Sequence, residues 1–392
     1  MSMKLQKNYN FFRKCYSKEV PFFHVIDVSD SVLFLMEVGA LDPYQQQVKI
    51  GIDDGQEKLK ICLSIIPLPG DSKNIVNSVK RVFIVGIAAG VPEKNENLRK
   101  MLGLIKIQDV DCVVTVDIKL ALMLVGKQSA GCTYICIYCN GKAPYDDHDQ
   151  ESNTLGFLVE NNRKYVTAGS ILKDSRDFQN VVDQPLLTGH APDVKIIQII
   201  IPPELHLMLG VVSKIMKALE DLVGKQFILD FLQEIGVTPN KKWGSALNGN
   251  QTRRLLNQVG KLKLGLQDRG VYSGMPFLET LQRFNKVVQS CFGQEREDGF
   301  KESIEKFSES YRCLGISITP KVHIVMDHLV EFFELRPEST AGLGYYSEQA
   351  FEAIHYDFLK FEEHCSVSKD HKDYRMKMMA IVQQYNSLHM GC

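Results

Sequence analysis

The sequence predicts an α/β protein in which a mixed β-sheet, flanked by helices, is interrupted by a large and mostly α-helical insertion. Two observations predict it. Residues 48–125 contain short apolar, β-branched segments separated by turn residues, with helical spacing appearing only after the third segment. From residue 204 onward, apolar residues recur three and four positions apart. The chain has 392 residues, 44% hydrophobic and 24% charged, which fits two or three globular domains and excludes a disordered or collagen-like chain.

The first part of the predicted sheet lies in residues 46–128. Strands are expected at residues 48–55, 58–68, 81–88 and 111–116, and helices at residues 94–104 and 118–125. The first two strands are expected to form a hairpin, because acids and a glycine lie between them. An order of three strands, a helix, a strand and a helix is typical of an RNase H-like core. Another α/β or α+β arrangement is the alternative.

The other regions complete the predicted organisation. Residues 1–45 are a mixed lead-in, and residues 129–320 form the helical insertion. Residues 196–201 are apolar and fit either a buried strand or the start of a helix. Helices in the insertion are expected from residue 204 and at residues 248–264, 273–292 and 299–312. Residues 321–392 return to the core with helices expected at residues 323–333, 347–364 and 374–388.

Acidic residues stand where strands of this sheet end. Asp53 ends the first strand, Asp117 ends the fourth, and Glu348 or Glu352 lies on a late predicted helix. Two-metal phosphoryl chemistry needs carboxylate oxygens that converge on two Mg²⁺ ions about 4 Å apart. The glutamates share one helix face, so spacing does not choose between them. Asp54 would point to the opposite face of its strand. Solvated turn acids are the alternative interpretation.

A second candidate site consists of Cys136-Ile-Tyr-Cys139 and His323-x4-His328. Two thiolates and two imidazoles can complete a tetrahedral Zn²⁺ site, and Cys132 is close enough to be an alternative ligand. Five residues on a regular helix turn a side chain by about 140°. Both histidines can therefore reach one ion only if the helix begins, ends or bends there. A buried cysteine pair with two unrelated histidines is the alternative.

Basic residues are concentrated locally, although the net charge is only −1. The stretches 241–263 and 360–377 are rich in lysine and arginine, and Arg253 and Arg254 follow the turn Asn248-Gly-Asn250 at the start of a predicted helix. Helix N-termini and arginines are common phosphate contacts, and an ordinary capped helix is the alternative. The balanced charge excludes a protein that coats polyanions through bulk charge but not one with a local nucleic-acid groove.

The sequence also bears on location. The first residues lack the apolar segment of a signal peptide, and no apolar run approaches the roughly 18 residues of a membrane span. We therefore expect an intracellular protein whose ten cysteines are mostly reduced.

Taken in order, these segments resemble the catalytic core shared by Transib transposases and the catalytic subunit of the V(D)J recombinase. The matching segments are Asp117-Ile-Lys followed by Cys136-Ile-Tyr-Cys139, then Gly249-Asn-Gln-Thr-Arg-Arg-Leu-Leu, then His323-x4-His328, and finally Ser347-Glu-Gln-Ala-Phe-Glu352. Thr252 stands where the family has alanine. The resemblance spans roughly residues 48–365 and is strongest in its shared order of short motifs.

The resemblance implies a DDE-type DNA recombinase on an RNase H-like fold. Asp53, Asp117 and Glu352 would bind two Mg²⁺ or Mn²⁺ ions, and water and then a freed 3′-hydroxyl would attack DNA phosphodiesters. It also implies a structural Zn²⁺ site and DNA contacts, whose residues are respectively Cys136, Cys139, His323 and His328, and Asn250, Arg253 and Arg254. A homodimer that acts on DNA in the nucleus, and no membrane association, would follow.

The chain also departs from the family. His355-Tyr356 stands where the family has an asparagine–lysine pair after the catalytic glutamate. We also expect the chain to be too short for a separate N-terminal DNA-binding region. These departures keep open a decayed or domesticated DNA-binding or scaffold protein on the same fold.

Overall fold

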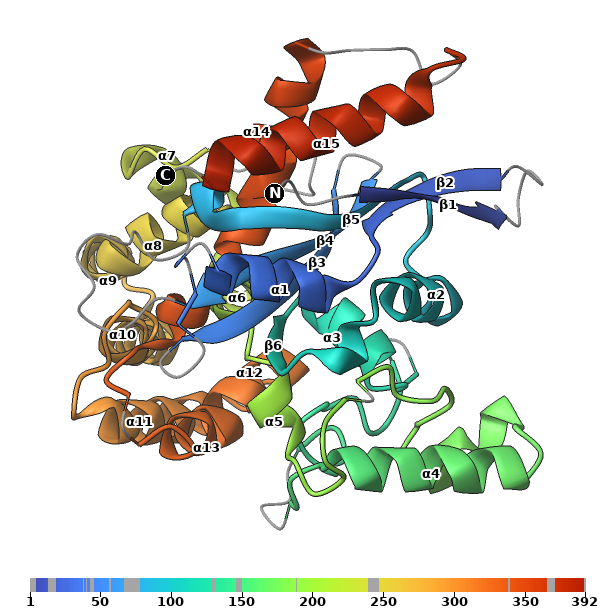
Figure 1. Cartoon of the computed structure of the whole chain (residues 1–392). Helices are drawn as coiled ribbons and strands as arrows, with labels where there is room; N and C mark the ends of the chain where they lie inside the picture. Colours follow the sequence, from blue (N-terminus) through green and yellow to red (C-terminus); the bar gives the residue numbers. More distant parts are fainter. Residues whose placement is uncertain are drawn as a thin grey trace. The chain divides into compact units, whose positions relative to one another are not determined.

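A computed structural model gives the fold of this chain (Figure 1). It describes residues 5–12, 19–37, 39, 41–42, 46–55, 58–66, 78–128, 131–145, 150–187, 189–238, 247–337, 339–364 and 371–390. The chain divides into two compact units. Unit 1 comprises residues 1–142, 149–201 and 346–392, and unit 2 comprises residues 143–148 and 202–345. The segment 149–201 therefore belongs with the sheet, whereas the sequence placed it in an insertion that began at residue 129.

Unit 1 is built on a mixed sheet in the order β1-β2-β5-β4-β3-β6. The strands are β1 (Leu5–Phe12), β2 (Glu19–Val25), β3 (Gln47–Gly55), β4 (Lys58–Ile66), β5 (Val82–Ala89) and β6 (Cys112–Thr115). β3 pairs with β6 in parallel, and the other neighbours in the sheet are antiparallel. The expected positions of β3 to β6 are confirmed. The segment 1–45, which was expected to be a lead-in, contributes to the sheet, because β2 pairs with β5.

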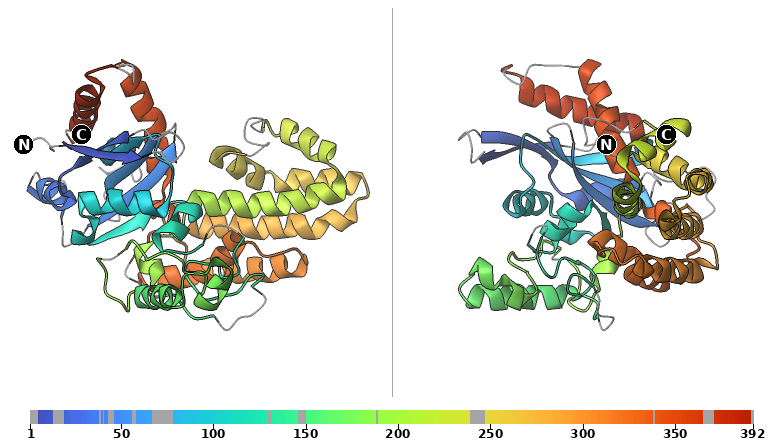
Figure 2. Two further views of the ribbon diagram at one scale, coloured as in Figure 1. Left: turned by 90° about the vertical axis from the view of Figure 1, so that its right-hand side faces the viewer. Right: turned by 180° about the vertical axis from the view of Figure 1, so that it is seen from behind.

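Helices cover both faces of this sheet. The helices of unit 1 are α1 (Val28–Glu37), α2 (Asn95–Ile105), α3 (Ile118–Leu124), α4 (Leu155–Thr167), α5 (Ile196–Ile199), α14 (Gln349–His364) and α15 (Tyr374–Met390), of which α4 and α5 do not lie on a face of the sheet (Figure 1). Figures 1 and 2 show α14 and α15 on one face of the sheet and α1, α2 and α3 on the other. Because it is covered on both faces, β4 is buried along its whole length.

Residues 196–201 combine the two structures that the sequence left open. One turn of helix, α5, is followed by Ile200, which forms a parallel bridge with Val114 of β6. The Ile201 N–H donates to the Val114 carbonyl at 2.9 Å. A short parallel contact thus extends the sheet on the far side of β6.

Unit 2 is helical in its described residues. Its elements are α6 (Glu204–Val223), α7 (Lys225–Glu234), α8 (Gly249–Asn257), α9 (Val259–Asp268), α10 (Met275–Cys291), α11 (Phe300–Cys313), α12 (Pro320–His323), a π-helical turn (Ile324–His328) and α13 (Leu329–Glu334). The aromatic rings of Phe284, Phe292 and Phe307 pack against one another in its core. The helix expected at residues 248–264 is two helices, α8 and α9, that meet at Gln258.

Among the described residues, none of the helices combines the length and the apolar composition that crossing a membrane requires.

Candidate active site and metal centre

The parallel pairing of β3 with β6 brings Asp53 and Asp117 to the same edge of the sheet. Gly51 is paired with Thr115, and each aspartate lies two residues further along its strand direction. Parallel neighbours end at the same edge, so both residues lie at that edge of the sheet. Asp117 also caps α3, since its Oδ1 accepts the Leu120 N–H at 2.6 Å.

Helix α14 packs directly on the face of β3 that carries Asp53. Side chains alternate along a strand, so Lys49, Gly51, Asp53 and Gly55 share this face. A Cβ atom at Gly51 would overlap the Phe351 ring, and one at Gly55 would overlap the His355 ring. The glycines thus allow a helix to approach the strand more closely than any other residue would.

The Asp53 carboxylate faces basic side chains of the protein itself. His355 Nε2 lies 2.7 Å from Asp53 Oδ2, without the alignment of a hydrogen bond. His355 Nδ1 contacts the Lys60 Nζ, and Lys60 is the residue of β4 that lies opposite Asp53 of β3 in the sheet register. Burial lowers the pKa of Lys60 to about 8. Sequence analysis did not identify either partner, although a lysine inside the apolar segment of β4 was a visible signal.

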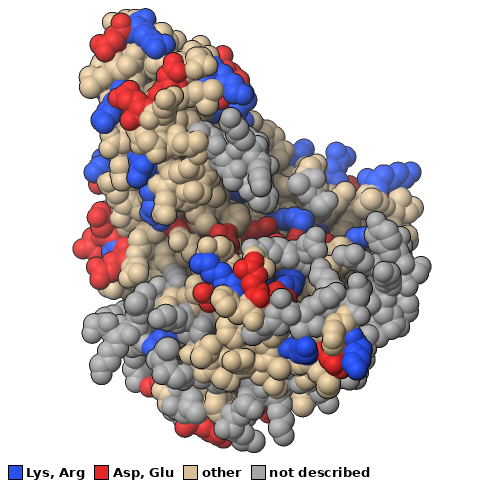
Figure 3. Space-filling model, turned by 90° about the horizontal axis from the view of Figure 1, so that it is seen from above, with Lys and Arg blue, Asp and Glu red and all other residues tan. Residues whose placement is uncertain are grey.

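Further acids gather near this edge. Burial, together with repulsion from Asp53, raises the pKa of Asp54. Burial raises the pKa of Glu93, an effect opposed by its ion pair with Lys119 and increased by the charges of Asp117 and Asp54. The carboxylates are therefore close enough to repel one another, and a bound cation would relieve that repulsion. On the face in Figure 3, acidic and basic side chains are interspersed.

The two late glutamates differ in their surroundings. Glu348 is 3% exposed, and its charge favours protonation of Lys49. Lys49 is buried, which lowers its pKa to about 7, and its Nζ donates to the Ser347 carbonyl at 2.9 Å. Glu352 is half-buried in the first turn of α14. Glu348 thus has a cation nearby in the sheet, and Glu352 stays the predicted catalytic acid.

The thiols of the Cys-x-x-Cys segment form a buried pair in unit 1. Cys136 and Cys139 are each 1% exposed. A hydrogen bond to Cys136, and then burial, raises the pKa of Cys139 above its usual range. The Gly141 N–H donates to Cys139 Sγ at 3.3 Å. Without a metal, Cys139 therefore keeps its thiol proton, which a bound Zn²⁺ would release.

Buried polar side chains hold the backbone of this segment. Lys127 Nζ donates to the carbonyls of Tyr134 and Cys136 at 2.9 and 2.5 Å. Asn153 Nδ2 donates to the carbonyls of Ile137 and Cys139 at 3.0 and 2.8 Å. An irregular buried segment needs such donors, because its carbonyls have no regular hydrogen-bond ladder.

The two imidazoles form a matching pair in unit 2. The π-helical turn Ile324–His328 hydrogen-bonds at i to i+5, so residues five apart lie on the same side. His323 Nε2 and His328 Nε2 are 3.1 Å apart. The opposite nitrogens face acids, with His323 Nδ1 2.6 Å from Asp327 Oδ2 and His328 Nδ1 3.6 Å from Glu331 Oε2. Carboxylates behind imidazoles are usual at zinc sites because they fix the tautomer.

Each unit holds two of the four predicted ligands, and all four are buried. Cys136 and Cys139 supply two thiols from unit 1, and His323 and His328 supply two imidazoles from unit 2. This Cys₂His₂ set has the composition of a structural zinc site and could hold one Zn²⁺ ion. Cys132 is not part of it, since its thiol donates to the Gln128 carbonyl at 3.6 Å.

The predicted DNA-contact residues sit at the start of α8. Asn248 caps the helix in a reciprocal capping box with Gln251, and Asn250 is exposed. Arg253 is ion-paired with Glu204, whose side chain is fully buried, and Arg254 donates to the Gly236 carbonyl at 3.0 Å. Arg253 therefore has a structural role, and contact with DNA stays a prediction. Of the basic stretches, Lys241, Lys242 and Lys369 lie outside the described residues.

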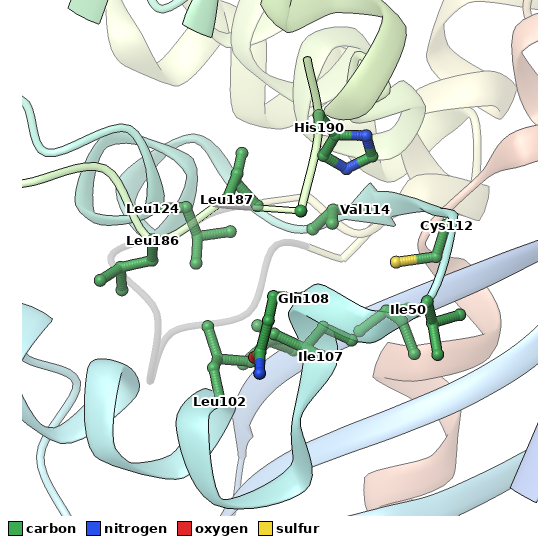
Figure 4. Close-up of a pocket in the computed structure, with 13 residues that line it drawn as sticks. Ile50, Leu102, Ile107, Gln108, Cys112, Val114, Leu124, Leu186, Leu187 and His190 are labelled. Carbon is green, nitrogen blue, oxygen red and sulfur yellow. The ribbon is translucent and has the colours of Figure 1, made fainter. Parts of the chain in front are cut away.

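Unit 1 also contains a small apolar cavity beside the sheet (Figure 4). It is lined by residues that include Ile50, Leu102, Val114, Leu187 and His190, and has a volume of ≈ 20 Å³. That is room for about one water molecule, so the cavity is no substrate site.

We compared the chain with protein-family models and with curated proteins. The chain matches no family model and no curated protein.

Proposed function

We propose that this chain is the core of a DDE-type DNA recombinase or transposase built on an RNase H-like sheet. Strands β3, β4 and β5 form an antiparallel set, and β6 lies parallel beside β3. The bridge at Ile200 supplies a further parallel contact beyond β6. The helices of unit 2 then intervene before α14 returns to β3. This order supports the proposed core.

One observation carries the proposed chemistry: Asp53 and Asp117 end adjacent parallel strands while the glutamate helix α14 packs on the same strand. The donor set suits Mg²⁺ or Mn²⁺, since these cations prefer carboxylate oxygens and the neighbouring acids repel one another without them. Asp53, Asp117 and Glu352 would hold the ions. Two bound ions would supply activation of the attacking oxygen and stabilisation of the leaving one.

The Cys₂His₂ cluster would be structural in this proposal. Cys136, Cys139, His323 and His328 leave no ligand position for a substrate when all four bind Zn²⁺, which is the difference between structural and catalytic zinc sites.

Nicking of supercoiled plasmid DNA in the presence of Mn²⁺ tests the proposal. Asp117→Asn should abolish nicking while leaving the fold intact, because asparagine caps a helix as well as aspartate does. Asp111→Asn is the matched control, since Asp111 precedes β6 and lies at the other end of the strand. Undiminished nicking by the Asp117 variant would refute the role of that carboxylate.

A non-catalytic DNA-binding or scaffold protein on the same fold is the second candidate. The contact of His355 with the Asp53 carboxylate favours it, because the protein's own base faces a predicted metal ligand. Such a protein would bind DNA with an affinity that falls as salt rises, and no divalent cation would support cleavage. The resemblance also implies a homodimer, which sedimentation of the purified chain would test.

A further inference from the structure

The imidazole of His355 packs over Gly55, next to the side chains of Asp53 and Lys60. Gly55 lacks the side chain that would overlap the imidazole ring. Asp53 Oδ2 lies 2.7 Å from Nε2 of this ring, and Lys60 contacts its Nδ1. His355 is 6% exposed and Lys60 1% exposed, so both side chains are buried beside the Asp53 carboxylate.

His355 and Lys60 reach this place from different elements. Lys60 belongs to β4, and its Nζ lies 5.6 Å from the centre of the Phe358 ring. His355 belongs to α14, and rotation about its side-chain bonds would withdraw the ring from the carboxylate.

We propose that His355 competes with a divalent cation for the Asp53 carboxylate, and thereby sets how strongly the site binds metal. This inference rests on the proposed function. A Mg²⁺ or Mn²⁺ ligand oxygen must approach the ion to about 2.1 Å, and an imidazole 2.7 Å from the same oxygen stands in the way. Cation binding at Asp53 therefore requires His355 to move aside.

Titration of Mn²⁺ into the zinc-loaded full chain, followed by calorimetry, tests the competition. His355→Gln removes the base. Gly55→Ala keeps the imidazole, but the added methyl group would displace the ring from its position beside Asp53. Each should strengthen Mn²⁺ binding by roughly 2- to 5-fold, the size of a contact with a carboxylate that is one-third exposed. His364→Gln is the matched control, since His364 lies on the same helix, is exposed, and interacts with the Lys360 carbonyl. It should change nothing. Thermal melting would establish that each variant is folded.

The outcomes separate this inference from the proposed function. Unchanged or weaker Mn²⁺ binding in folded His355→Gln overturns the competition, because the imidazole would then be neutral or helpful to the ion. If Asp117→Asn abolishes Mn²⁺ binding and nicking while His355→Gln changes neither, the proposed DNA cleavage is supported and the competition by His355 is refuted. If His355→Gln binds Mn²⁺ more tightly but cuts no DNA, the competition by His355 is supported and the proposed DNA cleavage is refuted. Absence of Mn²⁺ binding from every variant overturns both.

Discussion

The two candidate metal sites of this protein are built in opposite ways. The Cys₂His₂ ligands come from irregular backbone, a buried loop and a π-helical turn, and the ligands are at most 4% exposed. The carboxylates end regular strands, and Asp53 faces His355 and Lys60 from the protein itself. The difference teaches that the ligands of the first set are kept away from water, whereas a carboxylate of the second set already contacts a side chain of the protein itself.

The largest effect should come from removing a zinc ligand. Cys139→Ser should lose the metal and destabilise the fold by several kcal/mol, about the scale on which structural zinc contributes to folding. Zinc content and thermal unfolding would measure this, with Cys313→Ser as the control because Cys313 is exposed and outside the cluster. Asp53→Asn should leave zinc content unchanged. An unaltered metal content in the Cys139 variant would contradict the assignment.

The buried lysine beside α14 should make stability depend on pH. The pKa of Lys49 is about 7 in the fold and 10.5 ordinarily, so the unfolded chain binds more protons between these values. Stability should therefore rise with pH from about 7 to 10, by roughly 1.4 kcal/mol per pH unit at most. Lys49→Met should flatten that rise in urea unfolding at pH 7 and 9. Lys263→Met, on an exposed helix face, should not. Equal slopes in all three proteins would remove Lys49 as the cause.

A smaller effect is expected at the support of the thiol segment. Lys127→Met leaves the carbonyls of Tyr134 and Cys136 without their buried donor, which costs about 1–3 kcal/mol. Because the segment positions both thiols, zinc affinity should fall by about 10- to 100-fold. Competition with a chromogenic chelator would measure it, and the exposed Lys173→Met serves for comparison. If both variants hold zinc equally well, Lys127 does not position the thiols.

The smallest effect concerns the approach of α14 to the sheet. Gly51→Ala should destabilise the fold by about 1–3 kcal/mol, because the added methyl overlaps the Phe351 ring. Gly103→Ala, where nothing lies within 4 Å of the new methyl, should be neutral or stabilise α2 by up to about 1 kcal/mol. Denaturant unfolding of the pair would measure both. The same sign of change at both glycines would argue against a close helix–strand contact.

Sequence patterns predicted the elements that local physics determines. Alternating apolar residues located β3 to β6, and the Cys-x-x-Cys and His-x4-His spacings made Cys136, Cys139, His323 and His328 candidate ligands. The condition set for the histidines, a departure from a regular helix, is met by the π-helical turn.

Other features depend on contacts between distant segments and left little local trace. The pairing of β2 with β5 depends on tertiary packing rather than on residues 19–25 themselves. The contact of His355 with Asp53 needs both the hairpin register and the placement of α14. Lysines within apolar strands were visible, but only the folded sheet shows that Lys49 and Lys60 are buried against a helix.

The π-helical turn amounts to one surplus residue in an otherwise α-helical run. A homologue lacking Val325 would carry its imidazoles four positions apart, and an unbroken α-helix also presents such positions on one face. Evolution could therefore gain or lose that residue without relocating the ligands. Searches for related chains should therefore treat His-x3-His and His-x4-His as spacings that can supply the same two ligands.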